Sequence, residues 1–352
     1  MNKMSYQDVE RNIEFEFVRA TENAALNSIH WMGRGDKEAA DAAACDAIYG
    51  VFDLVDISGE VVIGEGIKDN APGIFLGDKL GTWIEDAPRF DIALDPIDGT
   101  SNISKGLPNS ISVLSAAWVP QDKKSCMVNI PSFYVEKLTY GPEVADAISK
   151  NDLAPIRLDA PFYRTLVIAA TALKKRISDL VVVVLDRPRN QSYIDAVRKE
   201  GASLRLISDG DIAAAVAPSL HDSGVDLYAG IGGAPEGILT ASALKALGGE
   251  IQLRMWPRDD EERADLLQTV SPSDLQRVYY TDDLIAGDSS IFCATGISDS
   301  ALLPGVKLVG NTATTHSILM RARSKTVRYI RAVHNLSEKT IHLRSSAGEK
   351  NI

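Results

Sequence analysis

Apolar residues recur at close to helical spacing near the start of the chain. Between about residues 6 and 32 they stand at Ile13, Phe17, Ala20, Ala24 and Ile29. This spacing predicts a helix with one buried face. A second helix is predicted over about residues 38–54, after the glycine-rich turn Gly33–Lys37.

Short apolar runs rich in β-branched residues, typical of buried strands, follow these helices. They predict strands at residues 61–63, 92–94, 111–118 and 126–130. From Leu166 onward, helical segments alternate with strands at residues 180–185, 204–208 and 225–231, and a further helix begins near Pro235. This alternation is typical of a parallel or mixed sheet. We therefore expect an α/β fold, built as an α+β layered sandwich.

The chain of 352 residues is longer than a typical single domain. Pro155 and Pro161 flank a polar stretch that we interpret as a soft boundary. We expect an N-terminal α+β domain over residues 1–157 and a C-terminal α/β domain over residues 158–352.

Charge and cysteine content narrow the classes of function. The net charge of −11 disfavours nonspecific binding to nucleic acid, because phosphate backbones require clustered Lys and Arg. The three cysteines, at 45, 126 and 293, are widely spaced and indicate free thiols in a reducing compartment. The first residues carry no apolar signal core, and no apolar run is long enough to span a bilayer. We therefore expect a cytoplasmic protein that does not enter a membrane.

Acidic residues stand at the ends of three predicted strands. The segment Asp95-Pro96-Ile97-Asp98-Gly99-Thr100 follows the strand at 92–94, and Gly64-Glu65-Gly66 follows the strand at 61–63. The third segment, residues 230–237, ends in Pro235-Glu236-Gly237. Ligands bind beyond the carboxyl ends of strands in open α/β sheets, and Mg²⁺ and Mn²⁺ take carboxylate oxygens. Alone, the first segment is as consistent with an ordinary turn as with a metal site, but three acids at strand ends favour the metal site.

Six motifs, taken in order, resemble the class II fructose-1,6-bisphosphatases of the lithium-sensitive phosphatase superfamily. They are Gly33-Arg34-Gly35-Asp36-Lys37 with Ala40-Asp41, Ile63-Gly64-Glu65-Gly66, Asp95-Pro96-Ile97-Asp98-Gly99-Thr100, Asp186-Arg187-Pro188-Arg189, Ser208-Asp209-Gly210-Asp211 and Gly232-Gly233-Ala234-Pro235-Glu236-Gly237. The resemblance extends from about residue 10 to residue 335. It implies the αβαβα arrangement of sugar phosphatases, with mixed sheets, metal binding in the N-terminal domain and substrate binding in the C-terminal one.

The resemblance also implies roles for individual residues. Mn²⁺ or Mg²⁺ would be bound by Asp41, Glu65, Asp95, Asp98 and Glu236. Thr100 and Glu65 would be catalytic, Thr100 by positioning the attacking water. The sugar bisphosphate would contact Asp98, Gly99, Thr100, Tyr134, Arg187, Pro188, Arg189, Asp209, Gly210, Asp211 and Gly233. This chain departs from the family pattern at Asp98, where some members carry Glu, at Ile67, where an acid is frequent, and at Asn190, where a His is common.

The implied activity is hydrolysis of the 1-phosphate of fructose 1,6-bisphosphate to fructose 6-phosphate and phosphate, in gluconeogenesis or sugar-phosphate cycling. Sedoheptulose 1,7-bisphosphate is a possible second substrate, and a homo-oligomer, dimer or tetramer, is expected. One alternative is an inositol-monophosphatase-like enzyme, although its usual Trp-Asp-x-x-Ala-Gly signature is absent from this sequence. Another is a non-catalytic sugar-phosphate sensor, which would be expected to have lost metal ligands.

Several charged residues also have simple structural interpretations. Asp36 is expected to cap the following helix as readily as to contact phosphate, and Glu236 suits the first turn of a helix after a proline. The run Arg258–Arg263 is interpreted as a solvated helix face. We interpret a basic cluster as an exposed strand face in preference to an effector or subunit contact; its members are Arg321, Arg323, Lys325, Arg328 and Arg331.

Overall fold

The computed structural model describes residues 6–64, 73–346 and 348–351, which form two compact units. The first unit comprises the chain up to Val128 together with the chain from Ala286 onward, and the second comprises Asn129–Ile285. The boundary expected between residues 157 and 158 instead falls inside the second unit. The reason is strand pairing, because late strands return to the sheet begun by early ones. The α/β class with mixed sheets is confirmed.

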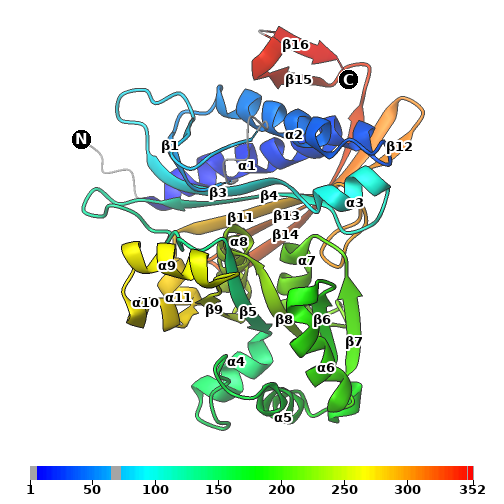
Figure 1. The fold of residues 1–352 in the computed structure, drawn as a ribbon. Helices are drawn as coiled ribbons and strands as arrows, with labels where there is room; N and C mark the ends of the chain where they lie inside the picture. The colour runs from blue at the N-terminus through cyan, green and yellow to red at the C-terminus, as the bar shows by residue number, and fades with distance from the viewer. Residues whose placement is uncertain (1–5, 65–72, 347, 352) are drawn as a thin grey trace. The chain divides into compact units, whose positions relative to one another are not determined.

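An eight-stranded mixed sheet forms the framework of the first unit (Figure 1). Its strands are β1 (Ser58–Ile63), β2 (Lys79–Leu80), β3 (Arg89–Asp98), β4 (Ile111–Trp118), β11 (Ser290–Gly296), β12 (Lys307–Val309), β13 (Thr312–Arg321) and β14 (Thr326–Asn335). The order is β12-β13-β11-β4-β3-β1-β2, and β14 also pairs with β13. β1 and β3 are parallel, and the other pairs are antiparallel.

Helices α1 (Tyr6–Ser28) and α2 (Lys37–Phe52) lie along one face of this sheet and appear in blue in Figure 1. Both helix predictions are confirmed. Phe17 of α1 is fully buried, and its ring centroid lies 6.0 Å from those of Phe52 and Phe90. Asp36 takes the capping role, one of the two considered for it, because its Oδ1 accepts a hydrogen bond of 2.9 Å from Ala39 N–H at the start of α2. The 3₁₀ turn η1 (Ile29–Trp31) and helix α3 (Thr100–Lys105) complete this layer.

A six-stranded mixed sheet forms the second unit, in the order β10-β9-β5-β8-β6-β7. Its strands are β5 (Tyr134–Tyr140), β6 (Val181–Leu185), β7 (Ser203–Ile207), β8 (Leu227–Gly233), β9 (Glu250–Met255) and β10 (Tyr279–Tyr280). β6 is parallel to β7 and β8, whereas β5 is antiparallel to β8 and β9. The strands predicted at 180–185, 204–208 and 225–231 are confirmed, with ends shifted by one or two residues.

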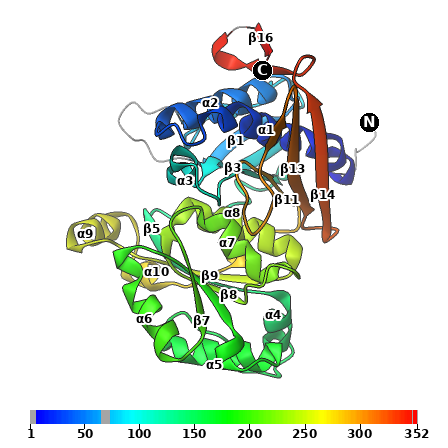
Figure 2. The same ribbon diagram turned by 90° about the vertical axis from the view of Figure 1, so that its right-hand side faces the viewer.

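Helices pack against both faces of this second sheet (Figure 2). One face is covered by α4 (Pro142–Ser149), α5 (Phe162–Leu173) and α6 (Gln191–Lys199), whose buried residues share a core with β5, β6 and β8. The other face carries α7 (Asp211–Val216) and α8 (Ala234–Leu247). Shorter elements are η2 (Ile177–Asp179), η3 (Pro188–Asn190), η4 (Ala217–Ser219), α9 (Asp260–Thr269), α10 (Pro272–Gln276) and α11 (Thr281–Leu284). The start of α9 is a solvated face, as predicted.

The strand predicted at residues 126–130 is wrong. The segment forms a single β-bridge, at Met127, and the backbone N–H of Met127 donates to the Asp91 carboxylate at 3.1 Å, so the pairing does not extend into a strand. The nearest strand is β5, which the sequence pattern did not reveal. Its adjacent charged residues Glu136 and Lys137 hide the alternation of a half-buried strand.

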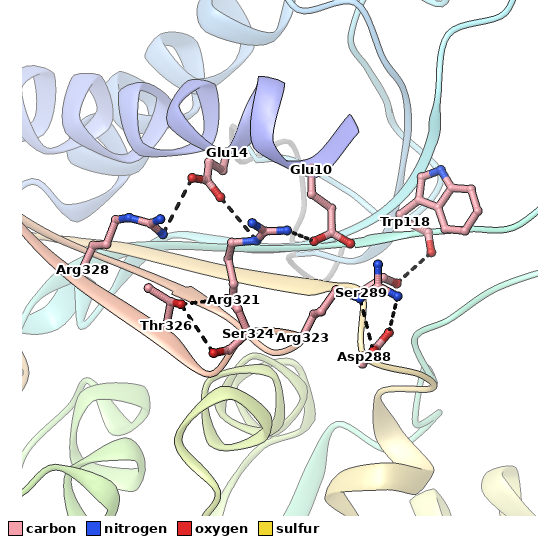
Figure 3. Close-up of polar contacts among 10 residues, drawn as sticks. All are labelled: Glu10, Glu14, Trp118, Asp288, Ser289, Arg321, Arg323, Ser324, Thr326 and Arg328. Carbon is pink, nitrogen blue, oxygen red and sulfur yellow. Dashed lines mark hydrogen bonds and ion pairs between the residues drawn. The ribbon is translucent and has the colours of Figure 1, made fainter. Parts of the chain in front are cut away.

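Ion pairs connect the β13–β14 hairpin to α1 (Figure 3). Arg321 of β13 donates to Glu10 Oε2 at 2.6 Å, and Arg328 of β14 lies 3.7 Å from Glu14 Oε1. Glu10, Glu14 and Arg321 are all buried, and burial raises the pKa of the Glu10 carboxyl. The predicted exposed basic face is therefore wrong for Arg321, while Arg331 is exposed as predicted.

A carboxyl-terminal segment packs against α2. It comprises β15 (Thr340–Leu343), the 3₁₀ turn η5 (Arg344–Ser346) and β16 (Gly348–Asn351). Arg344 forms an ion pair with Asp53 and lies 3.9 Å above the ring of Tyr49. The approach is closest at Gly50, where a Cβ would lie 1.8 Å from the carbonyl oxygen of His342. Within the described residues, no helix is long and apolar enough to cross a membrane.

Candidate active site

The acidic segment of the first unit lies where β3 meets α3. β3 continues through Asp98, beyond the predicted end of the strand, and its register against β4 shifts between Asp95 and Asp98. The N–H of Ile97 donates to Asp95 Oδ1 at 3.0 Å, which orients that carboxylate. Asp98 is buried, and α3 begins two residues later at Thr100.

Glycine is required at the turn between β3 and α3. Gly99 has a φ of +95°, and a Cβ there would lie 2.5 Å from the carbonyl oxygen of Asn109. Ser110 Oγ donates to the Gly99 carbonyl at 2.9 Å. The backbone that carries Asp98 and Thr100 is therefore fixed by its neighbours.

Asp41 lies in α2, beside these elements. The N–H groups of Gly33 and Gly35 donate to the carbonyls of Ile103 and Ser104 at 2.8 and 2.9 Å, which joins the turn before α2 to the end of α3. α2 also packs against β3. The first unit thus places Asp41, Asp95, Asp98, Gly99 and Thr100 on three adjoining elements.

The predicted metal centre stays a prediction at this point. Glu65 and Ile67 lie outside the described residues. Among the residues that are described, no group of three or more His, Cys, Asp or Glu side chains stands close enough to hold a metal ion. The carboxylates of Asp41, Asp95 and Asp98 therefore do not form a complete ligand set by themselves.

The other predicted site residues gather along one edge of the second unit's sheet. β6, β7 and β8 run parallel, and the segments Arg187–Arg189, Asp209–Asp211 and Gly233–Glu236 follow their carboxyl ends. Tyr134 begins the antiparallel strand β5 and pairs with Gly233. All four segments therefore meet at the edge where α/β sheets bind ligands.

A buried lysine of β5 lies behind this edge. Lys137 is completely buried, and its Nζ lies 2.8 Å from Asp211 Oδ2. The Tyr228 hydroxyl donates to the same Asp211 oxygen at 3.1 Å. Gly232 makes room for the pair, because a Cβ there would lie 2.2 Å from Asp211 Oδ2.

Glu236 lies next to this pair, in the first turn of α8. Its Oε2 is buried and, within the described part of the chain, has no hydrogen-bond partner. Burial raises the pKa of Glu236, and Asp211 raises it further, while Lys137 acts in the opposite direction. Gly233 leaves room for this carboxylate, because a Cβ there would lie 2.1 Å from Glu236 Oε2. A buried carboxylate oxygen of this kind is suited to bind a divalent cation.

Arg189 is held in a defined position. Its guanidinium lies 4.2 Å from the centroid of the Tyr134 ring, and its Nε donates to the Ile231 carbonyl at 3.0 Å. Asn190 locks the same turn, since its Oδ1 accepts from Ile231 N–H at 2.6 Å and its Nδ2 donates to the Leu185 carbonyl at 3.0 Å. The departure from the family pattern at Asn190 thus falls on a buried residue that joins β6 to β8.

Arg187 and the Asp209–Asp211 turn lie beside this position. Arg187 is half-buried, with one terminal nitrogen 3.7 Å from Asp209 Oδ1. Gly210 has a φ of +75° and precedes α7, which begins at Asp211. Two guanidinium groups therefore lie on the turns that follow β6, and Pro188 between them begins η3.

Lys137 was not among the residues predicted from the sequence. A lysine in a strand is ordinarily solvated, and only its position between Val135 and Thr139, on a face whose other residues are apolar or neutral, could have indicated burial. Tyr228 was missed for a similar reason, because a tyrosine in a buried strand is usually part of the core.

Known proteins resemble this chain over nearly its whole length. The family model for bacterial fructose-1,6-bisphosphatase, glpX-encoded, matches residues 11–334. A class 2 fructose-1,6-bisphosphatase of Haemophilus influenzae is 39% identical over 340 residues, covering 93% of this chain and 97% of the relative. Fructose-1,6-bisphosphatase 1 class 2 of Escherichia coli K12 is 38% identical over 344 residues, covering 94% of this chain and 97% of the relative.

The chain belongs to the family of bacterial, glpX-type fructose-1,6-bisphosphatases. The members of this family are metal-dependent phosphatases. The resemblance described from the sequence motifs is confirmed.

Proposed function

We propose that this protein hydrolyses the 1-phosphate of fructose 1,6-bisphosphate, producing fructose 6-phosphate and phosphate with the help of Mn²⁺ or Mg²⁺. Family membership supports the reaction class. The observation that carries the substrate assignment is the edge of the second unit's sheet, where Tyr134, Arg189, Asp211 and Gly233 meet. The three cysteines are buried thiols, which agrees with the cytoplasmic location that belongs to this proposal.

The arginines on the turns after β6 would bind the 6-phosphate, which is not cleaved. The bond that Arg189 makes to Ile231 uses Nε, so its terminal nitrogens would be the atoms that contact a phosphate. The Tyr134 ring holds the guanidinium plane, which reduces the entropy lost when a phosphate binds. Arg187 would add a second cation, and the backbone of Gly210 and Gly233 would let the sugar approach closely.

The carboxylates proposed as metal ligands are Asp41, Glu65, Asp95, Asp98 and Glu236. Glu236 fits this role, because its buried Oε2 accepts no hydrogen bond from the described residues and could therefore bind a cation. Bound divalent ions would neutralise the oxygens of the phosphoryl group and lower the pKa of the attacking water. Both effects address the very slow uncatalysed hydrolysis of phosphate monoesters.

The chain's own residues would then position the reacting groups. Thr100 is the first residue of α3, and its hydroxyl would orient the attacking water in line with the leaving oxygen. The rigid Gly99 turn would keep that hydroxyl in place. Lys137 would act as a positioning residue, because its ammonium fixes the Asp211 carboxylate beside the sugar-binding edge and offsets part of the charge of Glu236.

The experiment that tests this proposal measures phosphate release from fructose 1,6-bisphosphate, sedoheptulose 1,7-bisphosphate and inositol 1-phosphate, each with Mg²⁺ and with Mn²⁺. We expect the highest kcat/KM with fructose 1,6-bisphosphate and complete loss of activity after chelation. Full activity in a chelator would contradict the metal-dependent mechanism. A preference for inositol 1-phosphate would favour the inositol-phosphatase alternative, and inactivity toward all three in a folded, metal-loaded protein would favour a sensor.

A further inference from the structure

Two aromatic rings lie beside Tyr134, the residue whose ring supports the Arg189 guanidinium. The ring centroids of Phe133 and Tyr134 are 4.7 Å apart with an interplanar angle of 86°, and those of Trp256 and Tyr134 are 6.4 Å apart with an angle of 67°. Both pairs have the edge-to-face arrangement in which aromatic rings attract each other. The Tyr134 ring therefore has two ring neighbours in addition to the guanidinium that lies 4.2 Å from its centroid.

The backbone of Tyr134 is fixed, but this does not fix the direction of its ring. The Tyr134 carbonyl accepts hydrogen bonds from Trp256 N–H at 3.0 Å and from Ser132 Oγ at 2.6 Å, and strand pairing sets the residue opposite Gly233. The side chain can still rotate between staggered positions. The position that places the ring against Arg189 therefore depends on the side chains packed around it.

Phe133 is itself held by a charged side chain. The Arg258 guanidinium lies 5.3 Å from the centroid of the Phe133 ring. Arg258 is fixed by Glu262 of α9, whose Oε2 accepts from Arg258 Nε at 2.9 Å and from its backbone N–H at 2.7 Å. A continuous set of contacts therefore runs from the start of α9 through Phe133 and Tyr134 to Arg189.

The exposure of Phe133 separates a role in binding from a role in folding. Phe133 is 51% exposed, so about half of its ring gains nothing from burial. Its truncation should therefore cost little stability. A large effect on ligand binding would then have to come through the contact of Phe133 with Tyr134.

We propose that Phe133 and Trp256 are positioning residues for the 6-phosphate of the sugar bisphosphate, an inference that rests on the proposed function. They keep the Tyr134 ring against the Arg189 guanidinium, so that the terminal nitrogens of this arginine are presented in a fixed plane. A phosphate accepts two parallel hydrogen bonds from such a plane. Without the two rings, Tyr134 and Arg189 have more rotational freedom to lose when the phosphate binds, and affinity falls.

Titration calorimetry with fructose 6-phosphate and Mg²⁺ tests this role without turnover, because this sugar carries the 6-phosphate and has no 1-phosphate. Phe133→Ala and Trp256→Leu should each raise its Kd roughly three- to tenfold, the scale of one aromatic pair. Phe133→Tyr and Trp256→Phe keep a ring and should bind nearly as wild type does. With fructose 1,6-bisphosphate, Phe133→Ala should raise KM and change kcat less than twofold, because the 6-phosphate does not react.

A matched control and a second background make the test specific. Tyr163 is 45% exposed and lies in α5, which packs on α4 and α6. Tyr163→Ala therefore removes a ring of similar exposure elsewhere in the same unit and should leave the Kd unchanged. Arg189→Lys keeps the positive charge but not the flat group that stacks on a ring. In this background, Phe133→Ala should change the Kd less than twofold, because the stacking that it disturbs is already absent.

The possible results distinguish this inference from the proposed reaction. A wild-type Kd for Phe133→Ala would overturn the inference, as would an equal loss of affinity in the Arg189→Lys background or in Tyr163→Ala. It would also be overturned if the wild type did not bind fructose 6-phosphate. A wild type that binds this sugar with the expected dependence on Phe133, yet releases no phosphate from fructose 1,6-bisphosphate, would contradict the proposed reaction and support the positioning role.

Discussion

Replacing Lys137 by methionine tests the charge balance of the sugar-binding edge. The exchange keeps most of the side-chain volume and removes only the ammonium group. The ammonium is fully buried and lies 2.8 Å from an Asp211 carboxylate whose side chain is 5% exposed. After the exchange, Asp211 keeps the hydrogen bond from Tyr228, but its charge has lost the cation that neutralises it.

The expected cost is large. Removing one partner of a buried ion pair destabilises a protein by about 3–5 kcal/mol, because the other charge stays buried. At roughly 2–4 °C per kcal/mol for a unit of this size, the melting temperature should fall by roughly 6–20 °C. The matched control is Lys150→Met. The Lys150–Asp146 pair has the same 2.8 Å separation, but both side chains are more than 60% exposed, so its loss should leave the melting temperature nearly unchanged.

The pH dependence has a definite sign. Burial raises the pKa of Glu236 and Lys137 lowers it, so Lys137→Met should raise the pKa of Glu236 in the folded protein still further above its unfolded value. Groups with a raised folded pKa bind protons on folding, so the variant gains stability as pH falls. The difference in melting temperature from wild type should therefore be largest near pH 8 and smaller near pH 5.

The assay is thermal unfolding followed by circular dichroism, in a chelator, for wild type, both single variants and Lys137→Met/Asp211→Asn. The double variant also removes the unneutralised carboxylate of Asp211 and should recover most of the lost stability. A Lys137→Met protein that melts within 1 °C of wild type at pH 8 would refute the reasoning. A double variant no more stable than Lys137→Met would refute it as well.

Three further predictions concern the proposed reaction. Thr100→Ala should lower kcat roughly 10²-fold with an unchanged melting temperature, and Thr100→Ser should keep part of the activity; a near-normal kcat for the alanine variant would assign Thr100 to the turn alone. Arg189→Ala should raise KM for fructose 1,6-bisphosphate at least tenfold with a smaller change in kcat, whereas Arg205→Ala, on the exposed side of β7, should change neither. Burial raises the pKa of Glu236, so the folded state loses stability as pH rises through that pKa. In a chelator at pH 8, Glu236→Gln should therefore be more stable than wild type by about 1–3 kcal/mol in unfolding free energy and should have a higher melting temperature. The difference should disappear at low pH, and the variant should show no metal-dependent turnover. Equal melting curves at pH 8 would contradict the burial argument.

The elements that sequence reasoning predicted well have clean local patterns. α1 and α2 show helical spacing of apolar residues, and β4 occupies residues 111–118 as predicted. The position of two acidic segments was also predictable, because an apolar run followed by Pro and Gly marks the end of a strand, as at β3 and β8, whereas their role as metal ligands stays a prediction. Such patterns depend on neighbouring residues alone, which is why they can be read without tertiary information.

What sequence reasoning missed depends on contacts between distant residues. The N–H of Met127 bonds to Asp91, thirty-six positions earlier, so no local period could show that the segment is not a strand. Likewise, β11 pairs with β4 although all residues of the second unit lie between these two strands in the sequence. The chain is therefore not divided at residue 157. Lys137 is neutralised by Asp211, and neither residue indicates the other in the sequence.

The contact between Gly50 and the carboxyl-terminal segment has a consequence for how sequences vary among relatives. The family match ends at residue 334, before β15 begins at Thr340. Any residue larger than glycine at position 50 would collide with the His342 carbonyl, so the segment can rest on α2 only in a chain that has glycine there. Glycine at this position and a packed carboxyl-terminal hairpin should therefore occur together among relatives. In a relative with a larger residue at this position, the carboxyl-terminal segment could not pack against α2 in the same way.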